Sequence, residues 1–475
     1  MVNPGQAWLE HLEFEPEEAR MLGREAEGRK SLLRLDEQID FYRSLCKLGD
    51  DEVSPALRRL ARLAVRRYDG GKEHAELERM LLPRIGDMRE PEGYVREHLA
   101  LLREGLSRGH VGPVEVVEHF GAVELPGIVR SVGADSPWCE FAGFVSDELL
   151  PAARALGPDL WRLGEEEYTW IVANMGLLHS PSVLAQIAEA SLCRQQQTIS
   201  RLLGVPSFAA ARPRLEEITN LRLAPGEVVP AYREANARCV AFVREHGLFE
   251  LPDGFEIPLT VLAPEMEAVT HAGNLPAPLF GEGGGSFSIL DDGPRHRRAW
   301  VAPLAVHEGV PGHYLQSMLW QREFRDAGVA PSFVSGADVL AAERQDWGAM
   351  PAIEGWAVYA EDLMLEEGFH APEQAVAAAN FHAIRCARAW IDIGLHCQGM
   401  TRERATQIFV EEAGLELGDA ERELLRSMRV PTQALTYFAG WQSIAKLVAD
   451  SGLPRAQAHA RLLSHGPSLP LCLTR

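Results

Sequence analysis

Two histidines and a glutamate, His307, Glu308 and His313, stand together in LAVHEGVPGHYLQ (residues 304–316). A hydrolytic zinc site uses three protein ligands and one position open to water, and a nearby carboxylate takes the proton of that water. The usual His-Glu-x-x-His pattern meets this need because residues four apart share one helical face. Here the second histidine comes two residues later, so in a regular helix His313 points roughly 120° away from His307.

The Pro311-Gly312 pair falls within this spacing. Proline lacks an N–H, and its ring crowds the carbonyl group four residues earlier, which belongs to His307. Glycine tolerates unusual dihedral angles. We therefore expect the helix to kink or bulge here, absorbing two residues and returning His313 to the face of His307. The alternative is a kinked core helix with two incidental histidines.

A candidate third ligand lies downstream, in PAIEGWAVYAEDLMLEEG (residues 351–368). Glu354 and Glu361 are seven residues apart, so they share one face of an otherwise apolar helix. Buried carboxylates need a cation or hydrogen-bond partners. This pattern favours Glu354 as a ligand, and the alternative is a solvated helix face.

Composition limits the class of protein. The chain has 475 residues, enough for one extended domain or for two or three smaller ones, with 46% hydrophobic and 24% charged residues. Its seven cysteines are scattered and form no CxxC pair, which argues against a disulfide framework and is typical of a reducing compartment.

Charge and hydropathy bear on partners and location. The N-terminal stretch is acidic and lacks the apolar segment of a signal peptide, and no apolar run is long enough to span a membrane. A formal net charge of −21 repels phosphate backbones and anionic lipids. We expect a cytoplasmic protein that binds neither nucleic acid nor a membrane.

Most of the chain shows helical periodicity. The first 110 residues recur in apolar residues at three and four positions, and Gly70-Gly71 ends one such run. Connectors containing proline are expected near the following positions: Pro126, Pro137 and Pro151. Helices resume near residue 160, including one for which Ser180 or Ser182 would be the N-cap.

The exception is a zone rich in helix breakers, at about residues 206–294. It contains FEIPLTVLAP and SFSIL, which are typical of short strands. After Pro303 the pattern is helical again to about Asp450. The sequence therefore predicts a mainly α fold with a small β-sheet just ahead of the histidine motif.

HEGVPGHYLQ and EGWAVYAE resemble the paired signatures of a bacterial family of unknown function, DUF885, which is itself similar to the gluzincin metallopeptidases. Three more stretches agree in order: LGEEEYTWIVANMG, RCARAWIDIGLHCQGMTRERA and RSMRVPTQALTYFAG. The resemblance covers roughly residues 160–445. It implies a large helical fold with a small sheet beside a substrate channel. We expect an N-terminal helical region over residues 1–155 and a metallopeptidase-like catalytic region over residues 156–475.

The resemblance also implies roles for the residues of the motifs. His307, His313 and Glu354 would bind zinc. Glu308 would be the general base, and Glu361 would be a carboxylate that orients one of the histidines.

Further residues are implied to bind substrate. Arg388 and His396 lie at motif positions and would grip a carboxylate or polarise a carbonyl group. Arg426, at the start of its motif, would also bind substrate. For Arg388 the alternative is an internal salt bridge. Ser286 and Phe287 would belong to an edge strand along which an extended peptide binds.

The tyrosine of the last motif, Tyr437, resembles the one that such peptidases aim at the developing oxyanion, with a packed aromatic as the alternative. This motif also departs from the family pattern. The usual Pro-Gly-Gln reads Pro431-Thr432-Gln433, and the basic residue that often follows the tyrosine is Phe438. The first 150 residues show no such match.

These features favour a metal-dependent hydrolase of peptide or amide bonds, acting on a small peptide or an amide-containing small molecule. Two alternatives stay open: a family member recruited to a specialised-metabolism reaction, and a non-catalytic helical binding protein. Retention of Glu308 favours catalysis, because a purely structural metal site does not need that carboxylate. No Gly-x-Ser-x-Gly elbow or recognisable catalytic cysteine suggests another nucleophile.

Overall fold

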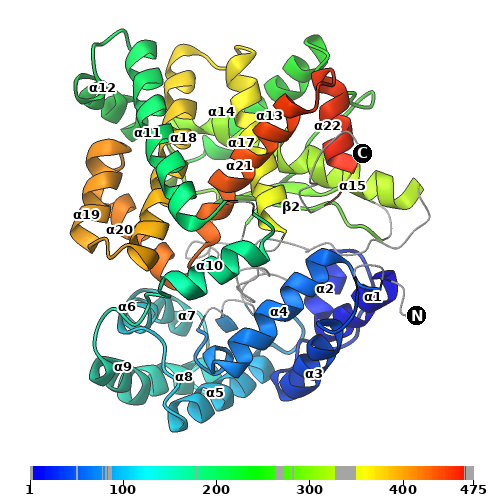
Figure 1. Cartoon of the computed structure of the whole chain (residues 1–475), viewed down its shortest axis with the longest axis vertical. Coiled ribbons are helices and arrows are strands. Elements are labelled where there is room, and N and C mark those ends of the chain that lie inside the picture. Colours follow the sequence, from blue (N-terminus) through cyan, green and yellow to red (C-terminus); the bar gives the residue numbers. More distant parts are fainter. Residues whose placement is uncertain are drawn as a thin grey trace. The chain divides into compact units, whose positions relative to one another are not determined.

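The computed structural model divides the chain into two compact units, which are described separately (Figure 1). The first unit contains Met1–Gly164, Gly328–Gly348 and Met428–Val430, and the second contains Glu165–Ala327, Ala349–Ser427 and Pro431–Arg475. The structure describes residues 4–49, 52–77, 79–80, 83, 88–177, 179–262, 271–280, 283–326, 349–464 and 466. The fold is mainly α with one small sheet, as predicted.

The described part of the first unit is helical. Its α-helices are α1 (Pro4–Phe14), α2 (Pro16–Met21), α3 (Leu35–Leu45), α4 (Pro55–Asp69), α5 (Pro91–Ser107), α6 (Val114–His119), α7 (Leu125–Arg130), α8 (Pro137–Phe144) and α9 (Leu150–Leu156). The Ser54 hydroxyl accepts a hydrogen bond from Leu57 N and caps α4. After α4, Gly71 adopts a left-handed conformation with φ 72°, which agrees with the predicted end of this helix.

Two local predictions for the first unit are wrong. The stretch EPEEARMLGREAEGRKSLLRLDEQIDFYRSLC (residues 15–46), which has helical periodicity throughout, is not one helix, because non-helical chain separates α2 from α3. Pro126, Pro137 and Pro151 lie in the first turns of α7, α8 and α9 rather than in connectors. Proline is tolerated at Pro137 because the first N–H groups of a helix have no intrahelical acceptor. Pro126 and Pro151 instead follow directly after the π-helical turns Phe120–Glu124 and Val145–Leu149, and such widened turns accommodate a proline within a continuing helix.

The second unit carries the remaining helices. They are α10 (Glu165–Asn174), α11 (Pro181–Leu202), α12 (Phe208–Asn220), α13 (Val228–Glu245), α14 (Val301–Glu308), α15 (His313–Asp326), α17 (Met350–Glu366), α18 (Pro372–Cys397), α19 (Arg402–Gln407), α20 (Leu417–Arg429), α21 (Gln433–Asp450) and α22 (Arg455–Ser464). Ser180 is the N-cap of α11, one of the two predicted. The zone at residues 206–294 contains α12 and α13, which the sequence reading missed. Among the described helices, none is long and apolar enough to cross a membrane.

The small sheet has three strands, β1 (Leu259–Val261), β2 (Ala272–Leu275) and β3 (Ser286–Ile289). Their order is β1-β3-β2, with β3 parallel to β1 and antiparallel to β2. The predicted strands at FEIPLTVLAP and SFSIL are therefore present. The prediction of an edge strand at Ser286 and Phe287 is wrong, because β3 is paired on both sides.

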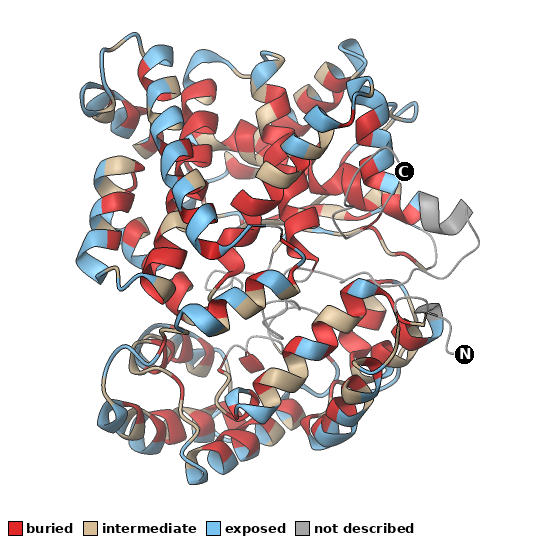
Figure 2. Ribbon diagram, viewed as in Figure 1, coloured by how far each residue is buried: buried red, intermediate tan, exposed pale blue. Residues whose placement is uncertain are grey.

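Buried residues fill the interior of each unit (Figure 2), and they make up most of α17 in the second unit. There α17 packs against α21, α14 and α18, and β2 contacts α14 and α15 (Figure 1). Gly355 of α17 and Gly440 of α21 allow an unusually close approach: a Cβ added at Gly440 would lie 2.0 Å from the Pro351 carbonyl oxygen. The helices that carry the two signature motifs thus form one buried layer.

Candidate metal centre

The helix that was expected to carry both histidines is interrupted between them. α14 ends at Glu308 and α15 begins at His313, so four non-helical residues separate them. The Gly312 N–H donates to the Val306 carbonyl oxygen at 3.0 Å, and a Cβ at Gly312 would lie 1.9 Å from the His307 carbonyl oxygen. The insertion thus separates two helices instead of forming a bulge within one, and it needs glycine at position 312.

Three predicted ligands converge. The Oε2 atom of Glu354 lies 3.3 Å from Nε2 of His307 and 3.4 Å from Nε2 of His313. One ligand atom from each residue lies within 4.8 Å of the other two. A tetrahedral ion with bonds of about 2.0–2.1 Å separates its ligand atoms by roughly 3.3 Å. The two distances to Glu354 therefore match the edges of such a tetrahedron.

The chemistry of these donors also fits a cation. Nδ1 of His307 lies 2.6 Å from Oε1 of Glu361, a carboxylate that can only accept, so this nitrogen carries a proton. In the neutral ring, Nε2 then presents a lone pair toward Glu354. Glu354 Oε2 is buried and makes no hydrogen bond of acceptable geometry in the described structure. A cation between these atoms would satisfy all of them, as buried polar groups require.

Electrostatics favour positive charge at this position. Burial lowers the pKa of His307, but the carboxylates of Glu354 and Glu361 raise it to about 10. Burial raises the pKa of Glu354, yet the charges of His313 and His307 hold it well below its ordinary value. Both pKa shifts have the same cause: the buried carboxylates of Glu354 and Glu361 and a cation beside them stabilise one another's charge.

Two hydrogen bonds join α17 to the segment that carries both histidines. The Trp356 Nε1–H donates to the Pro311 carbonyl oxygen at 2.9 Å, so α17 grips the connection between the two histidines. The Gln316 side-chain amide donates to the Ala352 carbonyl oxygen at 3.1 Å, which ties α15 to the same helix. Glu354 lies between these two attachment points, and its position relative to both histidines is therefore fixed.

Glu361 is itself held by a residue that the sequence reading did not assign. Arg385 of α18 donates from Nη1 and Nη2 to the two oxygens of Glu361, at 3.0 and 2.6 Å. Both side chains are buried. This bidentate pair fixes the carboxylate that orients His307. Arg385 is the first residue of RCARAW, one of the stretches that resemble the family. Because Arg385 and Arg388 are three residues apart, they lie on one helical face, and periodicity alone does not show which of them contacts Glu361.

The two predicted catalytic residues lie beside the ligand group. Glu308 follows His307 directly, and its charge contributes to the raised pKa of His307. The Tyr437 ring stacks near the His307 ring, with centroids 6.4 Å apart and planes 16° apart. Tyr437 reaches this position because it lies one turn before Gly440, where α21 touches α17.

Asp392 and Tyr168, which were not predicted to belong to the site, hold the start of α21, the helix that carries Tyr437. Thr432, just before α21, has φ 72°, and its N–H donates to Oδ2 of Asp392 at 2.9 Å. Tyr168 donates to the same oxygen at 2.5 Å. Glycine adopts the left-handed conformation of Thr432 without strain, which agrees with the Pro-Gly-Gln pattern that the resemblance implies.

The predicted substrate-binding residues divide into two groups. Arg426 contacts the tyrosine: its Nη2 lies 3.4 Å from Tyr437 Oη, and its Nε donates to Gln433 Oε1 at 2.8 Å. Arg388 instead pairs with Glu423 of α20, the internal salt bridge that was its alternative. His396 is buried and contacts the Ser427 carbonyl oxygen at 2.9 Å.

Ser286 and Phe287 have structural contacts in β3. The Phe287 side chain is fully buried against Tyr232, with ring centroids 5.3 Å apart. The Ser286 hydroxyl accepts a hydrogen bond from Thr260. The outer strand nearest the metal motif is β2, where the Asn274 amide donates to the Glu308 carbonyl oxygen at 3.3 Å.

Comparisons with known proteins place the fold. The solved structures that match nearly the whole chain include two described as putative lipoproteins, the first also as of unknown function. The one from Shewanella oneidensis has 18% identity and a TM-score of 0.68, covering 98% of each chain. The one from Colwellia psychrerythraea has 16% identity and a TM-score of 0.70, covering 100% of this chain and 98% of its own. At such identities the likeness concerns the fold alone.

None of the curated proteins matches the sequence. The model of a family described as "Bacterial protein of unknown function (DUF885)" matches residues 134–473, well over half of the chain. This range includes His307, His313, Glu354, Glu361 and Tyr437. The chain belongs to the DUF885 family.

Proposed function

We propose that the protein is a metal-dependent hydrolase of peptide or amide bonds in small substrates. One observation carries the proposal: Glu354 Oε2 is buried without a hydrogen bond and lies at tetrahedral edge distances from the Nε2 atoms of both histidines. His307, His313 and Glu354 would hold the ion, and zinc suits two imidazoles and one carboxylate.

When bound, the ion would polarise the scissile carbonyl group and lower the pKa of water. Glu308 would take the proton from the attacking water and return it to the leaving nitrogen. Tyr437 would donate its hydroxyl proton in a hydrogen bond to the developing oxyanion, which Arg426 strengthens by donating to that hydroxyl. Glu361 and Arg385 would keep the His307 proton on Nδ1, so that Nε2 remains a ligand.

The test separates metal binding from chemistry. Zinc-loaded wild-type protein would be incubated with a panel of dipeptides and N-acylated amino acids, and products measured by mass spectrometry. Glu308→Gln should retain the metal and lose roughly 100-fold or more of any hydrolysis, because only the proton acceptor is removed. Glu366→Gln, at the far end of α17, is the matched control and should retain both. Equal hydrolysis by wild type and Glu308→Gln would contradict the proposed role of the base.

A further inference from the structure

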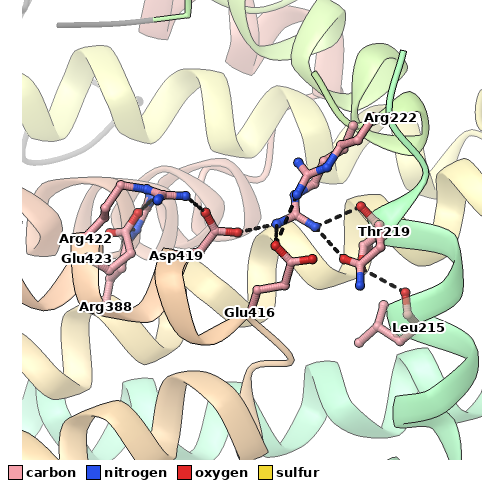
Figure 3. A network of polar contacts seen from close by, with 10 residues as sticks. Leu215, Thr219, Arg222, Arg388, Glu416, Asp419, Arg422 and Glu423 are labelled. Carbon is pink, nitrogen blue, oxygen red and sulfur yellow. Dashed lines mark hydrogen bonds and ion pairs between the residues drawn. The ribbon is translucent and has the colours of Figure 1, made fainter. Parts of the chain in front are cut away.

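One side of α18 carries a row of polar side chains. Its members are spaced by three or four residues along the helix: His382, Arg385, Arg388, Asp392 and His396. Four of them contact neighbouring elements, through the following pairs: Arg385 with Glu361, Arg388 with Glu423 (Figure 3), Asp392 with Thr432, and His396 with Ser427. The row therefore joins α18 to α17, to α20 and to the start of α21.

His382 is the exception in this row. Its side chain is fully buried, and neither of its ring nitrogens makes a hydrogen bond within the described structure. Burial lowers the pKa of His382, so the ring is neutral near pH 7 and carries one N–H. A buried donor without an acceptor costs free energy. A polar side chain in this position needs a partner to offset that cost.

The carboxylate of Glu361 lies just beyond hydrogen-bond length from His382. Nε2 of His382 is 3.8 Å from Oε2 of Glu361, about 0.8 Å more than an ordinary N–H···O bond. Within the described structure Oε2 accepts one hydrogen bond, from Nη1 of Arg385 at 3.0 Å. A carboxylate oxygen has two lone pairs, so Oε2 has capacity for a second donor. A displacement of about 1 Å forms that bond.

Packing holds the His382 ring close to this acceptor. The ring of Trp441, on α21, lies against it with centroids 4.7 Å apart and planes 59° apart. The Trp441 Nε1–H donates to Oδ2 of Asp362 at 3.3 Å, which ties this indole to α17. His382 thus contacts α21 through Trp441 and α17 through Glu361. A ring confined in this way loses little conformational freedom when it forms a hydrogen bond.

Glu361 is the carboxylate that orients His307. Its Oε1 lies 2.6 Å from Nδ1 of His307 and also accepts from Nη2 of Arg385 at 2.6 Å. A second donor on Oε2 limits rotation of the carboxylate group. Oε1 then stays aligned with Nδ1 of His307, and the ligand nitrogen on the other side of the imidazole keeps its direction.

We propose that His382 is a positioning residue of the candidate metal centre, which donates from Nε2 to Oε2 of Glu361 and so fixes, through Glu361, the orientation of the His307 ring. This inference rests on the metal site of the proposed function and adds a residue to it. His382 lies three residues before the RCARAW stretch and was not among the predicted site residues.

The first test separates zinc affinity from stability. Zinc affinity would be measured by competition with a chromophoric chelator, and the stability of the zinc-free proteins by urea denaturation. His382→Leu should bind zinc about 10- to 100-fold more weakly, because it has no donor for Glu361. Its zinc-free form should be no less stable than the wild type, since an unsatisfied buried group has been removed. His382→Gln supplies an N–H donor again and should stay within about threefold of the wild-type affinity.

His370→Leu is the matched control. The ring nitrogens of His370 also make no hydrogen bond in the described structure, but this residue lies in the connection between α17 and α18 and forms no described ion pair with Glu361. His370→Leu should bind zinc as tightly as the wild type does.

The second test reads the proton on His382 directly. Nuclear magnetic resonance of isotope-labelled histidines in the zinc-loaded wild-type protein shows which ring nitrogen carries the proton. The His382 signals, assigned by their loss in His382→Gln, should be those of a neutral ring protonated on Nε2. A side chain that only fills space has no reason to prefer this tautomer.

Three results would overturn the inference while leaving the metal site in place. They are a wild-type zinc affinity in His382→Leu, equal losses of affinity in His382→Leu and His382→Gln, and a His382 proton on Nδ1 in the zinc-loaded protein. Failure of the proposed function gives a different result, namely no zinc uptake by the wild-type protein, and that result contradicts the inference as well.

Discussion

Replacing Thr432 with glycine should stabilise the second unit. Thr432 is fully buried, has φ 72°, and its Oγ1 has no hydrogen-bond partner in the described structure. A residue with a Cβ in the left-handed region costs about 1–2 kcal/mol, and an unsatisfied buried hydroxyl about 1–3 kcal/mol. Glycine removes both penalties. The substitution retains the backbone N–H that donates to Asp392.

Two effects oppose this gain. Glycine adds about 0.5–1 kcal/mol of conformational freedom to the unfolded chain, and deleting the buried methyl group loses roughly 0.8 kcal/mol. The net expectation is a rise of about 1–2 kcal/mol in the free energy of unfolding. It would be measured by urea denaturation followed by tryptophan fluorescence, with the zinc content of each sample determined in parallel.

Thr436→Gly is the matched control because it makes the same substitution one turn later. Thr436 is also fully buried, but it lies within α21 and its hydroxyl donates to the Gln433 carbonyl oxygen at 2.7 Å. Here glycine removes a satisfied hydrogen bond worth about 1 kcal/mol and loses a few tenths of a kcal/mol of helix propensity relative to threonine, so stability should fall. If Thr432→Gly destabilises the protein as Thr436→Gly does, the argument from backbone strain at position 432 is refuted.

Three other substitutions test the supporting structure. Gly440→Ala should lower the free energy of unfolding by about 3 kcal/mol or more, because the added Cβ would overlap the α17 backbone. Gly143→Ala is the control, since its Cβ would meet no atom within 4 Å, and it should leave the free energy of unfolding unchanged or slightly raised in the same denaturation assay. Burial lowers the pKa of His459 to about 4, whereas the value in the unfolded chain is about 6.5. Its contribution of roughly 3 kcal/mol to stability is therefore complete above pH 6.5 and lost as pH falls toward 4. His459→Gln should reduce the pH dependence of the free energy of unfolding by this amount over that range, leaving the dependence due to the other buried histidines. Glu361→Gln should weaken zinc affinity by about 10- to 100-fold in competition with a chromophoric chelator, while an unchanged affinity would exclude its role in orienting His307.

The sequence predicted which side chains converge better than it predicted the path of the chain between them. Types and spacing were enough to single out His307, His313 and Glu354, because few residue types bind zinc and the flanking sequence is apolar. A continuous helix with a bulge was expected at Pro311. The actual break is stabilised by the hydrogen bond from Trp356, a contact 45 residues away in sequence that local patterns do not encode.

The incorrect or missing predictions also concern features that depend on contacts between residues distant in sequence. α12 and α13 were read as irregular because prolines suggested breaks, yet Pro213 lies inside α12 and Pro230 in the first turn of α13. A strand's neighbours depend on chain order in space, so the central position of β3 could not be read from SFSIL. Arg385 and Arg388 share one helical face, and only the packing of α18 on α17 selects Arg385 as the partner of Glu361.

The most direct test of the metal centre is the metal content of the purified protein, measured by inductively coupled plasma mass spectrometry after zinc is offered and excess removed. His313→Ala removes the late ligand, and His246→Ala, an exposed histidine of the same unit, is the matched control. The account predicts about one zinc per chain in wild type and in His246→Ala, and close to none in His313→Ala. No bound transition metal in the wild-type protein, or equal zinc in wild type and His313→Ala, would contradict it.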